Sequence, residues 1–166
     1  MLADNYAMLA RFNAWANKSI YKAAEDLGEA KIRAQHPAAY FGSILGTLNH
    51  LLVVDYMWFP RLEGVSRTDL KLNQTLHENF DDLRAAREAE DARIIERVDA
   101  IDEAKLATDC TFKDSKGNSW TLPVWQILST VFNHQTHHRG QVHALIKASG
   151  AEPPALDIPV YLRSLK

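Results

Sequence analysis

The chain has 166 residues, of which 46% are hydrophobic and 24% are charged, so a disordered or collagen-like chain is excluded. We expect residues 1–166 to form one domain, since a chain of this length can bury a core without disulfides. Lysine and arginine number 19 and aspartate and glutamate 21, which gives a net charge of −2 and no basic surplus for binding nucleic acid.

The beginning of the chain and its most apolar run suggest neither export nor membrane insertion. Residues 1–6 lack the basic and apolar regions of a signal peptide. The apolar run 44–59 is too short for a membrane span and is interrupted by polar side chains. The single cysteine, Cys110, cannot close a disulfide within the chain. We therefore expect a cytoplasmic protein that does not bind membranes.

Two long helices are predicted in the first 62 residues. Apolar and small residues at three- and four-residue steps predict a helix from about Leu2 to Leu27, and Gly28 follows where a positive φ would end it. A second helix is predicted from Gly42 or Ser43 to about Leu62, with Pro60 bending or ending it. This second helix is apolar nearly all round, so we expect it to be buried on more than one face.

The middle of the chain predicts a third helix followed by a hairpin. The segment Thr75-Leu76-His77-Glu78 fits a capping box, so the third helix is expected to begin near Thr75, with an inner face extending to Ile101. Two short runs rich in threonine and aromatic residues follow, at Leu106–Phe112 and Ser119–Leu122. The turn-forming residues 113–118 lie between them, which predicts a small β-hairpin.

The last long helix is predicted from Pro123 to Gly150, and Asp157-Ile158-Pro159 is expected to cap a short final helix that extends through Arg163. Four long helices with one amphipathic stripe each favour an all-α fold. We expect a four-helix bundle with the hairpin between its third and fourth helices.

Histidines are concentrated in the last long helix, in the segment Asn133-His134-Gln135-Thr136-His137-His138-Arg139-Gly140-Gln141. Side chains four residues apart on a helix lie one above the other, so His134 and His138 can reach one metal ion. His134 and His137 also share a face, and the spacing alone does not choose between His137 and His138. Helix bundles build metal sites from such pairs on facing helices.

His50 is the third candidate ligand. It lies among leucines in the middle of the second predicted helix, where a buried imidazole needs partners for its nitrogens. A hydrogen bond to a backbone carbonyl would satisfy it without a metal, which is the usual arrangement for a single buried histidine. Taken together, His50, His134 and His138 favour a metal. Three histidines with one open position are typical of a catalytic divalent site, where bound water forms hydroxide near neutral pH.

Other polar residues in apolar segments could hold an imidazole in one tautomer through a hydrogen bond. These candidates are Thr47, Asn49, Asn133 and Gln141. Asp55 could do the same or pair with Arg139. Ordinary caps and hydrogen bonds between helices explain all of them equally well. Cys110 has no basic neighbour in sequence, which is typical of an unreactive thiol.

At these residues the chain resembles the DinB/YfiT-like metalloenzyme family. The match comprises the helix segment from Asn133 to Gln141, His50, and Phe12-Asn13-Ala14-Trp15-Ala16-Asn17, and it extends over essentially the whole chain. The resemblance implies an up-down-down-up four-helix bundle with a crossover through residues 64–74. It also implies that His50, His134 and His138 bind one divalent ion, Zn²⁺ or Ni²⁺, with water completing the coordination.

The resemblance also implies a function. Characterised members of the family include thiol-dependent S-transferases and a mycothiol-dependent isomerase. We therefore expect a metal-dependent enzyme that transfers a low-molecular-weight thiol to an electrophilic small molecule. Metal-assisted hydrolysis is the second hypothesis, and a non-catalytic, metal-stabilised stress-response bundle or dimer is the third.

The apolar second helix further predicts an assembly. A helix in a bundle turns one side to the core, so its remaining apolar residues, such as Leu51, Val54, Trp58 and Phe59, need cover. The tail from Pro154 to Leu165 could supply that cover, and so could a second subunit. Because dimers with twofold symmetry are common and are frequent in this family, we expect a homodimer.

Overall fold

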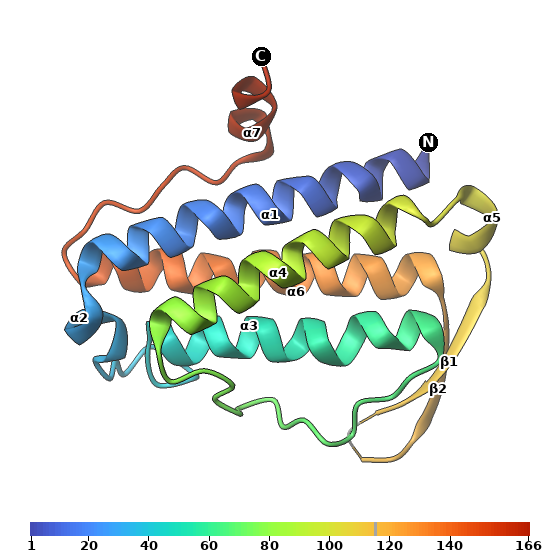
Figure 1. Cartoon of the computed structure of the whole chain (residues 1–166), viewed down its shortest axis with the longest axis horizontal. Coiled ribbons are helices and arrows are strands. Elements are labelled where there is room, and N and C mark those ends of the chain that lie inside the picture. The colour runs from blue at the N-terminus through green and yellow to red at the C-terminus, as the bar shows by residue number, and fades with distance from the viewer. Residues whose placement is uncertain (115) are drawn as a thin grey trace.

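Four long helices make up most of the structure. The computed structural model describes residues 1–114 and 116–166 of the chain. The long helices are α1 (Leu2–Leu27), α3 (Ile44–Trp58), α4 (Phe80–Asp99) and α6 (Val124–Ala148). They lie side by side in Figure 1, where α1 and α6 run in one direction and α3 and α4 in the other. Both α1 and α3 pack against α4 and α6.

Shorter elements connect the long helices. They are α2 (Glu29–Arg33), the 3-10 turn η1 (Phe59–Glu63), α5 (Glu103–Leu106), α7 (Ile158–Ser164), β1 (Asp109–Lys113) and β2 (Ser119–Pro123). The predicted hairpin is confirmed, since β1 pairs antiparallel with β2 and places Phe112 opposite Trp120. Its first strand begins at Asp109 rather than at Leu106, because Asp102 accepts a hydrogen bond from the Lys105 amide and caps α5 there.

The second predicted helix is divided at its proline. The regular helix α3 ends at Trp58, and η1 continues the chain with Pro60 in its first turn. Proline lacks the N–H that the α-helical hydrogen-bond pattern requires, which explains the change of helix type. Gly64 has a φ of 75° and closes the turn. At the other end, the Ser43 hydroxyl accepts a hydrogen bond from the Gly46 amide and caps α3.

The predicted start of the third helix was wrong. Residues 75–78 lie in the connection before α4, which begins at Phe80. The side chain of Asn79 is the cap, because its oxygen accepts hydrogen bonds from the amides of Asp81 and Asp82 at 2.8 and 3.1 Å.

Asn49 of α3 holds the segment that the capping box was expected to occupy. Its side-chain oxygen accepts hydrogen bonds from the amides of Leu76 and His77, and its amide group donates to the His77 carbonyl at 3.0 Å. The extended connection between α3 and α4 is thereby attached to the middle of α3. The expectation that Asn49 orients an imidazole was therefore wrong.

The apolar core contains buried polar residues from every long helix. One apolar cluster includes Ile20, Leu48, Leu83 and Ile146, and the other includes Tyr6, Phe59, Ile94 and Ile127. The buried residues between them are Asn13 and Asn17 of α1, Asp55 of α3, Arg87 and Asp91 of α4, and Gln135 and Arg139 of α6. We call these seven residues the polar layer.

The C-terminal tail covers α1 rather than α3, contrary to one of the two expectations. Figure 1 shows α7 beside α1. The Tyr161 ring of α7 lies 5.8 and 5.6 Å from the rings of Phe12 and Trp15 in α1. Leu51 of α3 and Phe59 of η1 are each 1% exposed without help from the tail. The apolar faces of α3 are thus buried between the helices and the hairpin of the chain itself.

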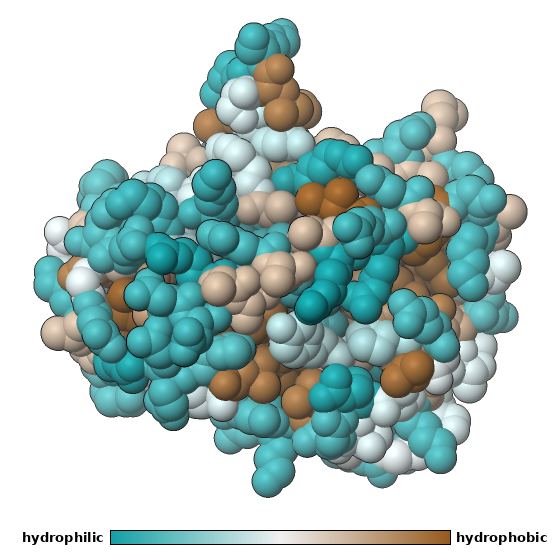
Figure 2. All heavy atoms as spheres, in the orientation of Figure 1, coloured by the Kyte–Doolittle hydropathy of each residue, from teal (hydrophilic) through white to brown (hydrophobic). Residues whose placement is uncertain are grey.

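Figure 2 shows that the face over α1 and α4 is largely hydrophilic, with hydrophobic atoms visible only in separate patches. The mixed charge along α4 in the sequence is consistent with such a face. None of the helices in the described part of the chain is long and apolar enough to cross a membrane.

Candidate metal centre

Three histidines from the neighbouring helices α3 and α6 come together at one place. His50 lies in the middle of α3, and His134 and His138 lie one turn apart on α6. The Nε2 atoms of His50 and His134 are 3.1 Å apart, and the three residues offer one nitrogen each within 4.8 Å of one another. The structure therefore brings together all three histidines that the sequence singled out as candidate ligands.

Hydrogen bonds determine which nitrogens of two rings face the cluster. His50 Nδ1 lies 2.7 Å from the Leu72 carbonyl, which can only accept, so this nitrogen carries the proton and Nε2 presents its lone pair. His138 Nδ1 lies 2.7 Å from the Gln141 side-chain oxygen and is protonated for the same reason. The amide of Gln141 then donates to His137 Nε2 at 3.1 Å. The sequence-based expectation that Gln141 orients an imidazole is thus confirmed as a contact.

The contact between His50 and His134 fits a pair of metal ligands. Nitrogens bound to one ion at about 2.0–2.1 Å in tetrahedral geometry lie about 3.3 Å apart, close to the observed 3.1 Å. A proton on His134 Nε2 would satisfy the same contact as a hydrogen bond, which is the arrangement without a metal. In either case His134 Nδ1 is buried and has no hydrogen-bond partner among the described residues.

Burial keeps the cluster neutral. His50 is only 4% exposed, and burial lowers its pKa to about 4. Burial also lowers the pKa of His134 to about 3, with a further contribution from the neighbouring His138 and His50. The pKa of His138 is likewise lowered, mainly by burial. Since imidazole binds metals only in its neutral form, all three rings are ready to act as ligands at pH 7.

An open cavity of about 500 Å³ gives access to the three histidines. Its lining residues are Tyr40, Phe41, His50, Val54, Trp58, Leu72, His134, His137, His138 and Gln141. Phe41 stacks on His50 with 3.8 Å between ring centroids and meets the edge of His138 at 5.5 Å. The sequence analysis missed Phe41, because it lies in a connection where no periodicity indicates burial. A small molecule can reach the cluster through this cavity.

Asp55 belongs to the polar layer and not to the histidine cluster. It forms an ion pair with Arg87 at 2.6 Å and accepts a hydrogen bond from the Gln135 amide at 2.6 Å. Arg139 instead donates to the side-chain oxygens of Asn13 and Asn17. Both roles expected for Asp55, contact with an imidazole and pairing with Arg139, were therefore wrong.

The other candidates have local roles. The Thr47 hydroxyl donates to the Ser43 carbonyl of its own helix at 2.8 Å. Asn133 lines a separate open pocket beside His134 and His137, and no hydrogen bond ties it to either ring within the described structure. The thiol of Cys110 is buried and donates to the Arg61 carbonyl, so it joins β1 to η1.

The long helices and the three-histidine cluster define a class of helical protein with a candidate metal centre between helices. The chain belongs to the DinB family, whose model matches residues 1–165. It is also 27% identical to "Protein DinB" of Bacillus subtilis (strain 168), in an alignment that covers 97% of this chain and 95% of that protein. The resemblance seen in the sequence is thus confirmed.

Proposed function

We propose that this chain is a divalent-metal-dependent enzyme in which His50, His134 and His138 bind one zinc or nickel ion. The observation that carries the proposal is the convergence of three imidazole nitrogens within 4.8 Å, with the protons of His50 and His138 directed away from the cluster. Imidazole suits both metals, so the donor set alone does not select one.

The residues around the cluster would prepare it for a ligand. The Leu72 carbonyl and the Gln141 side chain hold two imidazoles in the tautomer that a metal requires. Phe41 covers one face of His50 and limits the access of water. When bound, the ion would act as a Lewis acid that lowers the pKa of a coordinated thiol or water.

The reaction we propose is the transfer of a low-molecular-weight thiol to an electrophilic small molecule. Among the described residues that line the cavity there is no carboxylate, which leaves His137 as the imidazole outside the cluster that could act as a general base. A thiol depends less on such a base, because its ordinary pKa of about 8.5 is already close to neutrality. The composition of the cavity therefore favours a thiol over water as the nucleophile.

For the fold, we propose that residues 1–166 form one domain in which the long helices make the up-down-down-up bundle of the family. The directions of α1, α3, α4 and α6 and their packing support this arrangement. We also propose a cytoplasmic homodimer. The exposed side chains of Tyr40, Leu72 and Trp120, 86%, 49% and 53% accessible, offer apolar area for a second copy.

A metal analysis followed by a thiol assay tests the function. The protein is purified without an affinity tag, and its zinc and nickel contents are measured. Consumption of cysteine or glutathione in the presence of 1-chloro-2,4-dinitrobenzene is then followed with and without chelator. We expect metal-dependent acceleration that is lost in His50→Ala and retained in His36→Ala, whose histidine lies outside the cluster. Bound metal without any acceleration would favour the non-catalytic bundle.

A further inference from the structure

A buried arginine lies close to the histidine cavity and takes no part in the cluster. Arg61 belongs to η1 and is 5% exposed. Its guanidinium group lies in the corner formed by two aromatic rings that meet edge to face, 4.0 Å from the ring centroid of Trp58 and 4.5 Å from that of Phe112. Stacking of this kind fixes the plane of the guanidinium and leaves its N–H edge available to a ligand.

Within residues 1–114 and 116–166 the guanidinium makes no ion pair at contact distance, and Asp114 acts on it through its charge without touching it. Arg61 Nε is buried without a hydrogen bond, and no carboxylate of the described chain forms an ion pair with the guanidinium. Asp114 lines the same cavity, but one of its oxygens accepts hydrogen bonds from the Asn118 and Trp120 side chains. Its other oxygen accepts from two backbone amides of the same turn. A buried charge without a partner is costly, so an unpaired arginine here indicates a binding role.

The backbone around Arg61 does not need the guanidinium to hold it. The Arg61 carbonyl accepts hydrogen bonds from the Cys110 thiol and from the Gly64 amide, which join η1 to the hairpin and close the turn. An apolar side chain of similar length could fill the same corner beside the two rings without the cost of burying a charge. The two ring faces favour a cation, and the N–H edge without an ion pair is the feature that packing leaves unexplained.

The space in front of Arg61 is apolar and adjoins the histidine cavity. It measures about 400 Å³, and its other walls are Met57, Trp58, Leu72, Phe112, Asp114, Trp120 and Leu122. Trp58 and Leu72 line both cavities. His50, Val54 and Trp58 follow each other at four-residue steps along α3, so the surface from the cluster toward Arg61 is one helix face about 12 Å long.

We propose that Arg61 binds the carboxylate of an amphiphilic small molecule whose apolar body lies between Trp58, Phe112 and Trp120. The guanidinium fork matches a carboxylate in two parallel hydrogen bonds, and the walls offer apolar and aromatic surface to the remainder of the molecule. The relation to catalysis rests on the proposed function. In the proposed thiol transfer, one of the two reactants carries a carboxylate, and its reactive end extends along α3 toward His50.

Binding of 4-phenylbutyrate to chelator-treated, metal-free protein tests the proposal. Trp58 and Trp120 line the site, so tryptophan fluorescence reports occupancy. The matched uncharged probe is 4-phenylbutanol. We expect saturable binding of the carboxylate, with an affinity about tenfold or more above that of the alcohol. Equal affinities of the two probes, or no binding of either, would overturn the proposal.

Variants connect the signal to the arginine. Arg61→Met retains apolar volume without charge, and we expect it to bind the carboxylate and the alcohol equally weakly. Arg61→Lys retains a cation without the fork and should bind the carboxylate with an intermediate affinity. Arg93→Met, which removes an exposed arginine paired with Glu90, should bind as the unchanged chain does. Unaltered carboxylate binding in both Arg61 variants would contradict the assignment.

The same measurement separates this inference from the proposed function. Because the protein is free of metal, binding at Arg61 does not depend on the histidine cluster. His50→Ala should therefore retain the affinity for 4-phenylbutyrate even though it abolishes the thiol reaction. Loss of carboxylate binding in His50→Ala would show that the probe occupies the histidine cavity instead, and would reject Arg61 as its site.

Discussion

The polar layer extends over all four long helices, and on α3 and α6 it lies beside the histidine cluster. On α6 each histidine of the cluster is followed by a residue of the layer, His134 by Gln135 and His138 by Arg139. Successive residues of a helix point about 100° apart, so one side chain of each pair faces the cavity and the other the core. The helix α6 thus carries two groups of buried polar residues. The groups differ in the partners that satisfy their polar atoms.

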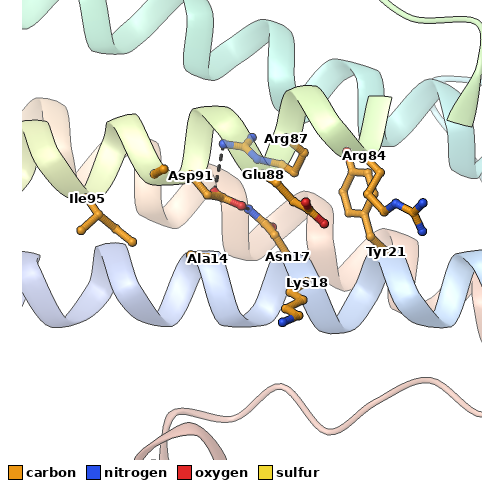
Figure 3. Close-up of a pocket in the computed structure, with 10 residues that line it drawn as sticks. Ala14, Asn17, Lys18, Tyr21, Arg84, Arg87, Glu88, Asp91 and Ile95 are labelled. Atoms are coloured by element: carbon orange, nitrogen blue, oxygen red, sulfur yellow. Dashed lines mark hydrogen bonds and ion pairs between the residues drawn. The ribbon is translucent and has the colours of Figure 1, made fainter. Parts of the chain in front are cut away.

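Within the layer, charges complete one another. Arg87 lies between Asp55 at 2.6 Å and Asp91 at 3.0 Å, and Figure 3 shows the contact with Asp91 beside Asn17 of α1. Asn17 in turn donates to Asp91 and accepts from Arg139. These ion pairs and amide hydrogen bonds connect all four long helices, which is the arrangement of a structural network.

In the cluster, three imidazole rings converge, and no charged side chain of the described residues is part of the group. Two of the three rings turn their protons outward to Leu72 and Gln141, so their lone pairs face inward. Self-completed charges indicate a role in folding, whereas converging lone pairs indicate an external ligand. Arg61 resembles the cluster in that no ion pair holds it, whereas Arg87 forms ion pairs with Asp55 and Asp91.

The largest expected effect comes from breaking the layer. Arg87→Met removes the cation between two buried carboxylates, and such a loss typically costs about 3–5 kcal/mol of stability. Urea unfolding followed by circular dichroism measures it. The control is Arg84→Met, which removes an arginine whose side chain is 35% accessible, and the cost should stay within about 1 kcal/mol. Equal costs for the two variants would contradict the structural role of the layer.

Breaking the cluster should affect metal binding far more than folding. His134→Ala and His138→Ala each remove one of three ligands, and we expect both to lose the ion, about one per chain in the unchanged protein. His137→Ala is the matched control, since His137 packs against the His138 ring and Gln141 but offers no nitrogen to the cluster. Elemental analysis of the purified variants measures the outcome. Loss of metal in His137→Ala with retention in His138→Ala would reverse the ligand assignment.

A smaller effect is expected from the residue that orients His138. Gln141→Leu leaves all three histidines in place but removes the acceptor of the His138 Nδ1 proton. Such outer contacts are typically worth about 10–100-fold in metal affinity. Competition with a chromophoric chelator measures the affinity. An unchanged affinity would show that the ring is positioned by packing against Phe41 rather than by the hydrogen bond.

The pH dependence of metal-free stability should be gradual. The folded pKa values of His50 and His134, about 4 and about 3, lie below the ordinary value of 6.5. Below pH 6.5 the unfolded chain takes up protons that the folded chain does not, so stability is complete above pH 6.5 and falls as the pH drops toward 4. Thermal unfolding at pH 7.5 and 5.0 measures this loss. It should be smaller in His134→Gln, which removes one of the titrating groups.

The smallest effect is expected from a change in the assembly, because it alters neither the polar layer nor the histidine cluster. We expect sedimentation equilibrium at micromolar concentration to give twice the 18.7 kDa mass of the chain. If Tyr40 lies in the contact, Tyr40→Ser should shift the equilibrium toward the monomer without loss of metal. A monomer mass for the unchanged protein would reject the homodimer. The exposed apolar side chains would then be explained as walls of the two cavities.

The sequence by itself determined the elements whose information is local. Periodic apolar residues predicted α1 and α6, because a helix of that length repeats its pattern several times. The proline in the second helix and the turn formers of the hairpin acted through their own backbone chemistry. The step from His134 to His138 likewise follows from helix geometry alone. Each of these features depends on residues within a few positions of one another.

Tertiary structure decided everything that depends on distant partners. Asn49 takes up the amides of Leu76 and His77, so α4 is capped by Asn79 and begins at Phe80 despite a well-formed capping box. Packing of α3 against α6 brings His50 to His134, 84 positions away in the chain, and places His138 rather than His137 in the cluster. Which buried charges are paired, as Arg87 is and Arg61 is not, also depends on the side chains that other elements supply, and local pattern carries no information about them.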